Sequence, residues 1–181
     1  ARDLPNPSPC GCPPSLSSTR LPRAQAGSSF ASVELRVEIA GVDPFEVTSM
    51  RGRERLSTCF QIDLTVAAPD DADLAALLGR TARFILDRPP EPRIFAGVIA
   101  RVQRGETIDR GHRIGKLRLV PRLWQLGLNR ASRVFQSLTT VEIAERLFRA
   151  SGIGLRKDLS LPLAEREICI QHDESDLAFV E

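Results

Sequence analysis

The clearest periodic segment of the chain runs from residue 114 to residue 120. Leu117 and Leu119 fall on one side of it, while Lys116 and Arg118 fall on the other. A period of two is typical of a strand with one buried face. Pro121 removes a backbone donor and biases the residue before it away from helix, so we expect the strand to end at residue 120.

The same alternation predicts further short strands upstream. They lie at residues 32–40, 45–50, 59–67, 81–87 and 94–104. Proline, glycine and charged residues separate them, as is typical of turns. Gly97 lies inside the longest of these strands and indicates a bulge or a close backbone contact. A meander of this kind closes readily into a small antiparallel barrel, because closure removes the exposed strand edges.

A short helix is predicted between the strands at residues 59–67 and 81–87. Aspartates precede it and can cap its free backbone donors. Leucines form its expected buried stripe, and a glycine is expected to end it. The residues concerned are Asp70, Asp71 and Asp73, then Leu74, Leu77 and Leu78, then Gly79.

A longer helix is predicted to begin at Thr139. Thr139 and Glu142 have the S/T-x-x-E spacing of a capping box, in which hydroxyl and carboxylate each satisfy an orphan backbone donor. Ile143, Leu147 and Ala150 follow at helical spacing and predict its apolar stripe.

The final segment carries weaker signals. Residues 166–172 alternate weakly and are interpreted as a strand. Asp173, Ser175 and Asp176 then indicate the start of a second helix, with Leu177 on its apolar side.

Composition divides the chain into a tail, a barrel and a linking segment. Residues 1–29 are rich in proline and serine without apolar periodicity, so we expect a disordered tail. Residues 30–137 are assigned to a first barrel domain, and residues 138–181 to the helix and linking segment after it. The overall fold class is therefore mainly β with short helices and some α+β character. The chain is 42% hydrophobic with a formal net charge of +2, which implies no strong attraction to nucleic acid or membrane.

Side chains suited to catalysis are few. The two histidines are His112, in a polar turn where a solvated ring is expected, and His172, beside two carboxylates and expected to pack or hydrogen-bond. The sequence has no G-x-S-x-G or H-E-x-x-H motif. We therefore predict no catalytic, cofactor-binding or metal-binding residue, no cofactor and no enzymatic activity.

The four cysteines form no recognisable metal motif. Cys10 and Cys12 are closer than the C-x₂-C spacing of a zinc pair and have no second pair nearby. Cys59 and Cys169 lie among apolar residues and are expected to act as small core hydrophobes. The aspartates before the short helix lack the glycine and terminal glutamate of a calcium loop.

Phenylalanine and arginine side chains bear on binding. Phe60, Phe84 and Phe95 fall on apolar strand faces, which favours core packing over the base stacking of single-strand binders. The run from Arg51 to Arg55 places an arginine at every second position. It is either a solvated loop or a subunit contact, and the sequence leaves both interpretations open.

Several motifs in a fixed order resemble those of one protein family. They are "GRERLSTCFQIDL" at residues 52–64, "IFAGVIARV" at 94–102, "LVPRLW" at 119–124, "SRVFQ" at 132–136 and "REICIQHDESDLAFVE" at 166–181. Together they resemble the VgrG proteins, the spike proteins of bacterial type VI secretion, which are similar to the hub proteins of contractile phage tails. The resemblance covers residues 45–181.

The resemblance implies a barrel of the phage tail-hub type with a structural role. The family's proteins form a homotrimeric hub that caps a secretion tube and carries a puncturing needle and effectors. The expected partners are further copies of the chain, the hexameric tube protein Hcp, and effectors or adaptors. We expect no nucleic acid partner and no insertion into a membrane. In the family a second barrel, an oligonucleotide/oligosaccharide-binding-type fold and a needle follow, so the chain is expected to be an N-terminal piece.

The resemblance also implies a route out of the cell. We expect assembly in the bacterial cytoplasm and export by the type VI system without a signal peptide, because the N-terminus has no apolar run of that kind. The alternative function is a small barrel that binds oligosaccharide or nucleic acid. Low net charge and scarce aromatic residues weigh against it.

Overall fold

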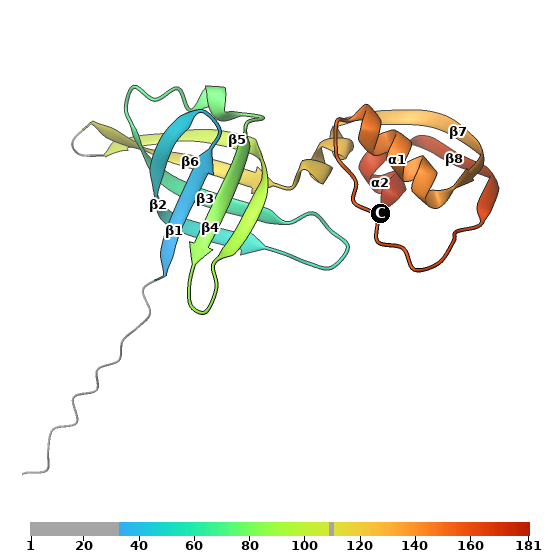
Figure 1. Cartoon of the computed structure of the whole chain (residues 1–181). Helices are drawn as coiled ribbons and strands as arrows, with labels where there is room; N and C mark the ends of the chain where they lie inside the picture. The colour runs from blue at the N-terminus through green and yellow to red at the C-terminus, as the bar shows by residue number, and fades with distance from the viewer. Residues whose placement is uncertain (1–32, 109–110) are drawn as a thin grey trace, which may run out of the picture. The chain divides into compact units, whose positions relative to one another are not determined.

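The computed structural model describes residues 33–108 and 111–181. Residues 34–120 form a closed barrel (Figure 1). Its strands are β1 (Glu34–Ile39), β2 (Val42–Arg53), β3 (Gln61–Pro69), β4 (Thr81–Asp87), β5 (Arg93–Ile108) and β6 (His112–Val120). Their order around the barrel is β1-β2-β3-β6-β5-β4, and β4 pairs back with β1. The expected six-stranded antiparallel barrel is therefore present, and the predicted tail at residues 1–29 lies outside the described residues.

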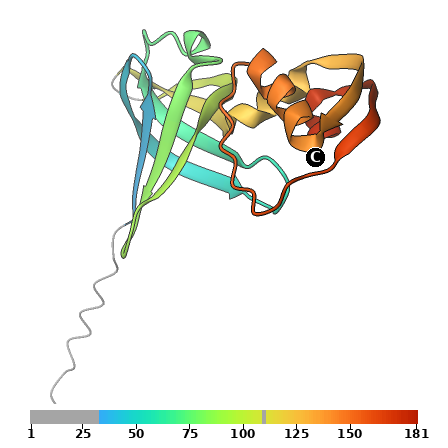
Figure 2. The ribbon, with the colours of Figure 1, turned by 45° about the vertical axis from the view of Figure 1, so that its right-hand side comes forward.

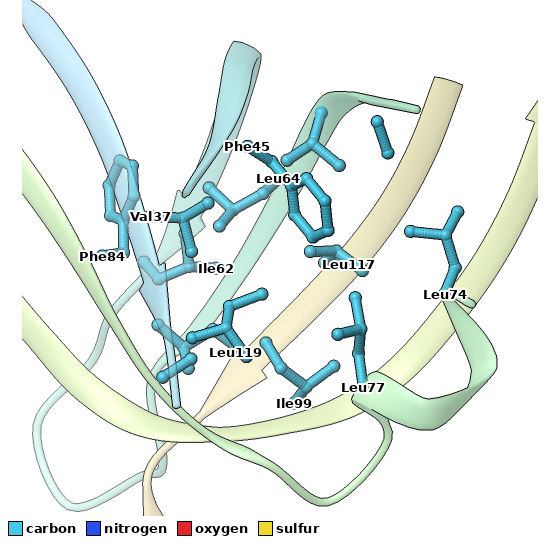
Figure 3. Packing of buried hydrophobic residues seen from close by; sticks show 14 of the residues in the cluster. Val37, Phe45, Ile62, Leu64, Leu74, Leu77, Phe84, Ile99, Leu117 and Leu119 are labelled. Atoms are coloured by element: carbon cyan, nitrogen blue, oxygen red, sulfur yellow. The ribbon is translucent and has the colours of Figure 1, made fainter. Parts of the chain in front are cut away.

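Alternation along the strands fills the barrel interior. Leu117 and Leu119 of β6 are buried as expected, and they meet Leu64 and Ile62 of β3 in register. Figure 3 shows these side chains converging from several strands into one core. Burial of this apolar surface is the main favourable term for the barrel.

The phenylalanines pack inside the same core. The ring centroids of Phe60 and Phe95 lie 5.4 Å apart in an edge-on arrangement, and those of Phe84 and Phe95 lie 6.3 Å apart. Phe84 is fully buried. The expectation of core packing is confirmed, and these rings form no platform on which bases could stack.

A close backbone contact explains Gly97 in β5. A Cβ atom at this position would lie 1.9 Å from the carbonyl oxygen of Val120. The expected close approach is therefore present. The register of β5 against β6 shifts further along, between Ile99 and Arg101, so the bulge lies beyond the glycine.

The short helix is a single 3₁₀ turn, η1 (Ala75–Leu77). Asp73 Oδ1 accepts hydrogen bonds from the backbone N–H groups of Ala75 (3.1 Å) and Ala76 (3.3 Å), so the expected aspartate cap is confirmed. Leu77 is buried, but Leu78 is 60% exposed, and its prediction as a core residue is wrong. The turn ends one residue earlier than an α-helical stripe would require, and Leu78 has an extended backbone.

A second unit follows the barrel. It contains η2 (Arg122–Leu128), β7 (Arg130–Thr139), α1 (Thr140–Ala150), β8 (Glu165–Ser175) and α2 (Asp176–Val180). The strands β7 and β8 pair antiparallel, and α1 lies against one face of this sheet (Figure 2). The small core between them contains Phe135, Ile143 and Leu147.

The helix α1 begins as the sequence predicts. Thr139 Oγ1 accepts a hydrogen bond from the backbone N–H of Glu142 (3.3 Å), and the N–H of Thr139 donates to Glu142 Oε2 (2.8 Å). Both halves of the capping box are thus formed. Ala150, expected on the apolar stripe, is exposed in the last turn. None of the helices in residues 33–108 and 111–181 is long and apolar enough to cross a membrane.

The sheet pairing bears on where the barrel ends. A domain boundary after residue 137 stays a prediction. Strand β7 exchanges its ladder hydrogen bonds with β8 and with no barrel strand.

Candidate functional site

The two histidines lie on the surface. His112 is the first residue of β6 and is exposed, and His172 is exposed on β8. The ring of His172 is therefore not packed in the small core. Within the described ranges, no three His, Cys, Asp or Glu side chains gather in a way that could hold a metal ion. The absence of catalytic and metal-binding residues from the whole chain stays a prediction.

The described cysteines are two free thiols, Cys59 and Cys169. Both are half-buried, and Cys169 packs against the core of the second unit, as expected for a small hydrophobe. Burial raises the pKa of the Cys59 thiol, which keeps it protonated at neutral pH. Cys10 and Cys12 lie outside the described residues.

The second unit contains a buried carboxylate, Asp176, which is 2% exposed. Its Oδ2 accepts a hydrogen bond from Asn129 Nδ2 (2.8 Å), and its Oδ1 accepts one from Gln171 Nε2 (2.8 Å). The guanidinium of Arg133 donates to both oxygens. We call these four residues the Asp176 cluster; they join the end of η2, both strands and the start of α2.

Electrostatics in the Asp176 cluster favour the charged form of Asp176. Burial alone raises the pKa of this carboxyl, but the hydrogen bonds from Arg133, Gln171 and Asn129 outweigh it. The pKa of Asp176 therefore lies below its usual range. All its donors come from within the chain, so the cluster is a structural joint and offers no unsatisfied group to a substrate.

The sequence analysis located this region but not its chemistry. Ser175 caps α2, because its Oγ accepts a hydrogen bond from the N–H of Ala178 (3.1 Å). Asp173 lies outside the helix with a positive φ of 41°. The inward turn of Asp176 toward Arg133 has no signal in the local pattern, because the two residues are 43 positions apart in the sequence.

The outer face of the β7–β8 sheet is apolar. Val134 and Ile170 lie directly opposite each other, and Ile168 lies opposite Gln136. Val134 is 61% exposed, Ile170 is 59% exposed and Ile168 is 58% exposed. Contiguous exposed apolar side chains mark surfaces that other protein segments cover. This face is the clearest candidate contact surface of the second unit.

The arginine run of the sequence falls partly in the barrel. Arg51 and Arg53 belong to β2 and project outward, opposite Asp63 and Gln61 of β3, while Arg55 lies in the connection after the strand. Pairing of β2 with β1 ends at Glu46, so at Arg51 and Arg53 the strand is paired with β3 alone among the described strands and its other edge is open. The interpretation of the run as a subunit contact stays a prediction.

The described residues thus form a closed barrel filled by side chains, followed in the chain by a unit whose buried carboxylate is satisfied by donors of the same chain. The phage tail baseplate hub (GPD) family matches residues 53–181. The chain belongs to this family.

Individual relatives agree with the family match. The chain is 39% identical over 153 residues to the type VI secretion system spike protein VgrG5 of Pseudomonas aeruginosa, covering 81% of this chain and 19% of the relative. It is 33% identical over 142 residues to VgrG4b of the same organism, covering 75% of this chain and 17% of the relative. The chain therefore spans a small part of the length of these relatives, and the expected resemblance to VgrG proteins is confirmed.

A solved structure shows the same fold. It is an Escherichia coli component of the type VI secretion system, described as similar to the T4 bacteriophage tail proteins gp27 and gp5. The TM-score is 0.71 at 26% identity, and the match covers 80% of this chain and 41% of the other. The predicted fold class, mainly β with a tail-hub barrel, is confirmed.

Proposed function

We propose that the chain is a structural part of a type VI secretion spike. In this proposal it forms part of a homotrimeric hub that caps the tube and carries the needle and effectors. The observation that carries it is the closed barrel at residues 34–120, together with the likeness to a component of that system. The proposed partners are further copies of the chain, the tube protein Hcp, and effectors or adaptors.

The barrel suits a structural role because its interior is packed. Phe84, Leu117 and Leu119 fill the space where a small ligand would otherwise bind. The alternative of an oligosaccharide- or nucleic-acid-binding barrel is not favoured, because the aromatic rings lie inside. The family is one of structural hub proteins, and we propose no enzymatic activity for the described residues.

A location in the cell follows from the same proposal. The hub would assemble in the bacterial cytoplasm and leave through the type VI machine without a signal peptide. Fractionation of a strain with and without a working type VI system tests this step. Release of the protein from the strain that lacks the system would contradict it.

Symmetry gives a test of how the barrel is used. Two barrels in each of three chains would present a pseudo-sixfold ring to a hexameric tube, whereas one barrel for each chain would not. We therefore expect the 181-residue chain to be monomeric in light scattering at micromolar concentration. A stable trimer of this chain alone would count against the two-barrel arrangement.

A chimera tests the function itself. This chain would replace the corresponding region of the Pseudomonas aeruginosa spike protein, and export of the tube protein would be measured. We expect export to continue. A matched chimera with Val37→Asp, which places a charge in the barrel core, should lose export because the barrel cannot fold. Loss of export by the unaltered chimera, despite stable expression, would refute the proposal.

A further inference from the structure

One outer face of the barrel carries basic side chains on three strands, β2, β6 and β5, with a single acid on β3 between them. In register, Arg51 of β2 lies opposite Asp63 of β3, Asp63 lies opposite Arg118 of β6, and Arg118 lies opposite Arg101 of β5. Lys116 lies two positions before Arg118, on the same side of β6. We define the basic face by its cations and its one acid: Arg51, Arg53, Arg101, Lys116, Arg118 and Asp63.

The charges of the basic face are not balanced within the barrel. Arg118 Nε donates to Asp63 Oδ1 at 2.7 Å, which neutralises one cation. Arg51, Arg53 and Lys116 make no ion pair within residues 33–108 and 111–181. Arg101 stands directly opposite Arg118 in register, and the charges of both act on the one carboxylate, Asp63. The single acid is thus shared among several cations, and the face keeps an excess of positive charge.

An excess of positive charge of this kind points to a role outside the barrel. Five cations share one acid on the basic face, and local conflicts of this sort are expected at functional surfaces. The face also has a shallow hollow of about 220 Å³ between β3, β6 and β5. Asp63, Thr65, Arg101, Lys116 and Arg118 contribute to its lining, so a small anionic group could enter it with cations on several sides.

We propose that the basic face binds an acidic segment of a partner protein, with one partner carboxylate seated in the hollow between Arg101, Lys116 and Arg118. Guanidinium groups bind carboxylates through two parallel hydrogen bonds. Asp63, whose oxygens already accept hydrogen bonds from Arg118 and Gln61, repels a second acid beside the first, which fixes the orientation of the segment. The proposal does not depend on the trimeric hub.

Protein carboxylates fit this face better than nucleic acid does. None of its residues is aromatic, so bases would find nothing to stack on. Asp63 lies in the middle of the row and would repel a continuous phosphate backbone. The chain as a whole has a formal net charge of only +2, far from the strongly basic balance of proteins that bind nucleic acid.

The experiment measures the anisotropy of a fluorescein-labelled oligoglutamate peptide mixed with the 181-residue chain. We expect binding at low ionic strength that weakens steeply toward ~0.5 M NaCl, because the contacts are exposed charges. The double variant Arg101→Glu and Lys116→Glu should bind at least ~10-fold more weakly, because it turns attraction into repulsion. Asp63→Asn should bind several-fold more tightly, because it removes the only acid in the hollow.

A matched control separates the face from the net charge. The double variant Arg88→Glu and Arg156→Glu makes the same charge change at two exposed arginines outside the basic face. It should retain affinity to within about twofold. Circular dichroism should show all variants folded, because none of the altered side chains is buried.

Three results would overturn the proposal. The wild-type chain could fail to bind oligoglutamate, or both double variants could lose affinity equally, which would reduce the effect to net charge. Tighter binding of a labelled oligothymidine than of oligoglutamate would assign the face to nucleic acid instead.

Discussion

Replacing Asp176 by alanine should destabilise the pairing of β7 with β8. The change removes the acceptor for Asn129, Gln171 and Arg133, and it leaves a guanidinium with its main anionic partner gone. Removing one member of a buried ion pair costs about 3–5 kcal/mol. In this protein the remaining partners of Arg133 offset part of this loss of stability. Arg133 still donates to Gln171 Oε1 at 2.9 Å, and its side chain is 32% exposed to water.

We therefore place the expected loss near the lower limit, at about 3 kcal/mol in the free energy of opening β7 from β8. Hydrogen exchange of the β7 and β8 amides measures this quantity directly, because exchange of paired amides requires the sheet to open. The barrel amides should be unaffected, since the Asp176 cluster lies wholly in residues 129–176.

A neighbouring carboxylate supplies the control. Asp173 pairs with Arg130 at 3.5 Å, but its side chain is 77% exposed. Asp173→Ala should cost no more than about 0.5 kcal/mol, as is usual for surface ion pairs. An Asp176→Ala loss below about 1 kcal/mol, or equal losses in both variants, would refute the structural role of the buried carboxylate.

Three further outcomes are expected. Because the pKa of Asp176 is lowered on folding, its stabilisation is complete above the ordinary carboxyl range and is lost as pH falls through the lowered pKa; exchange measured in an acid series should show this loss in the wild type and not in Asp176→Asn. Gly97→Ala should lower the barrel's stability by more than about 2 kcal/mol in thermal unfolding, because a Cβ would lie 1.9 Å from the oxygen of Val120. Gly154→Ala, where the new Cβ meets nothing within 4 Å, is its control and should be near neutral. Thr139→Ala removes the helix cap and should cost about 1 kcal/mol, seen as reduced protection of the α1 amides.

The barrel could be predicted from the sequence because the alternation of apolar and polar residues can be recognised within a few consecutive positions. Along β1, β3 and β6 apolar side chains point inward at every second position, so the period of two is visible without knowledge of the partner strand. The capping box at Thr139 is local in the same way. Leu78 was misplaced because an α-helical spacing was applied to a single 3₁₀ turn.

Strand β7 was not predicted, because at its centre a polar side chain faces inward and an apolar one faces outward. Arg133 turns inward toward Asp176, while Val134 turns outward, so the usual alternation is broken at its centre. β8 shows the same inversion, with Gln171 buried and Ile170 exposed. The Asp176 cluster and the basic face depend on pairings across distant strands, which no local pattern records.

The contrast between the two sheets has a consequence for how a larger particle could grow. The barrel closes through its six strands, but among the described residues the end of β2 at residues 50–53 is paired with β3 alone, and the end of β5 beyond Arg101 is paired with β6 alone. The paired strands β7 and β8 each keep one outer ladder without a partner strand among the described residues. Extension of a sheet from one molecule into the next can therefore begin beside Val134 and Ile170, or at the open ends of β2 and β5, whereas the strands paired on both sides offer no backbone group for it.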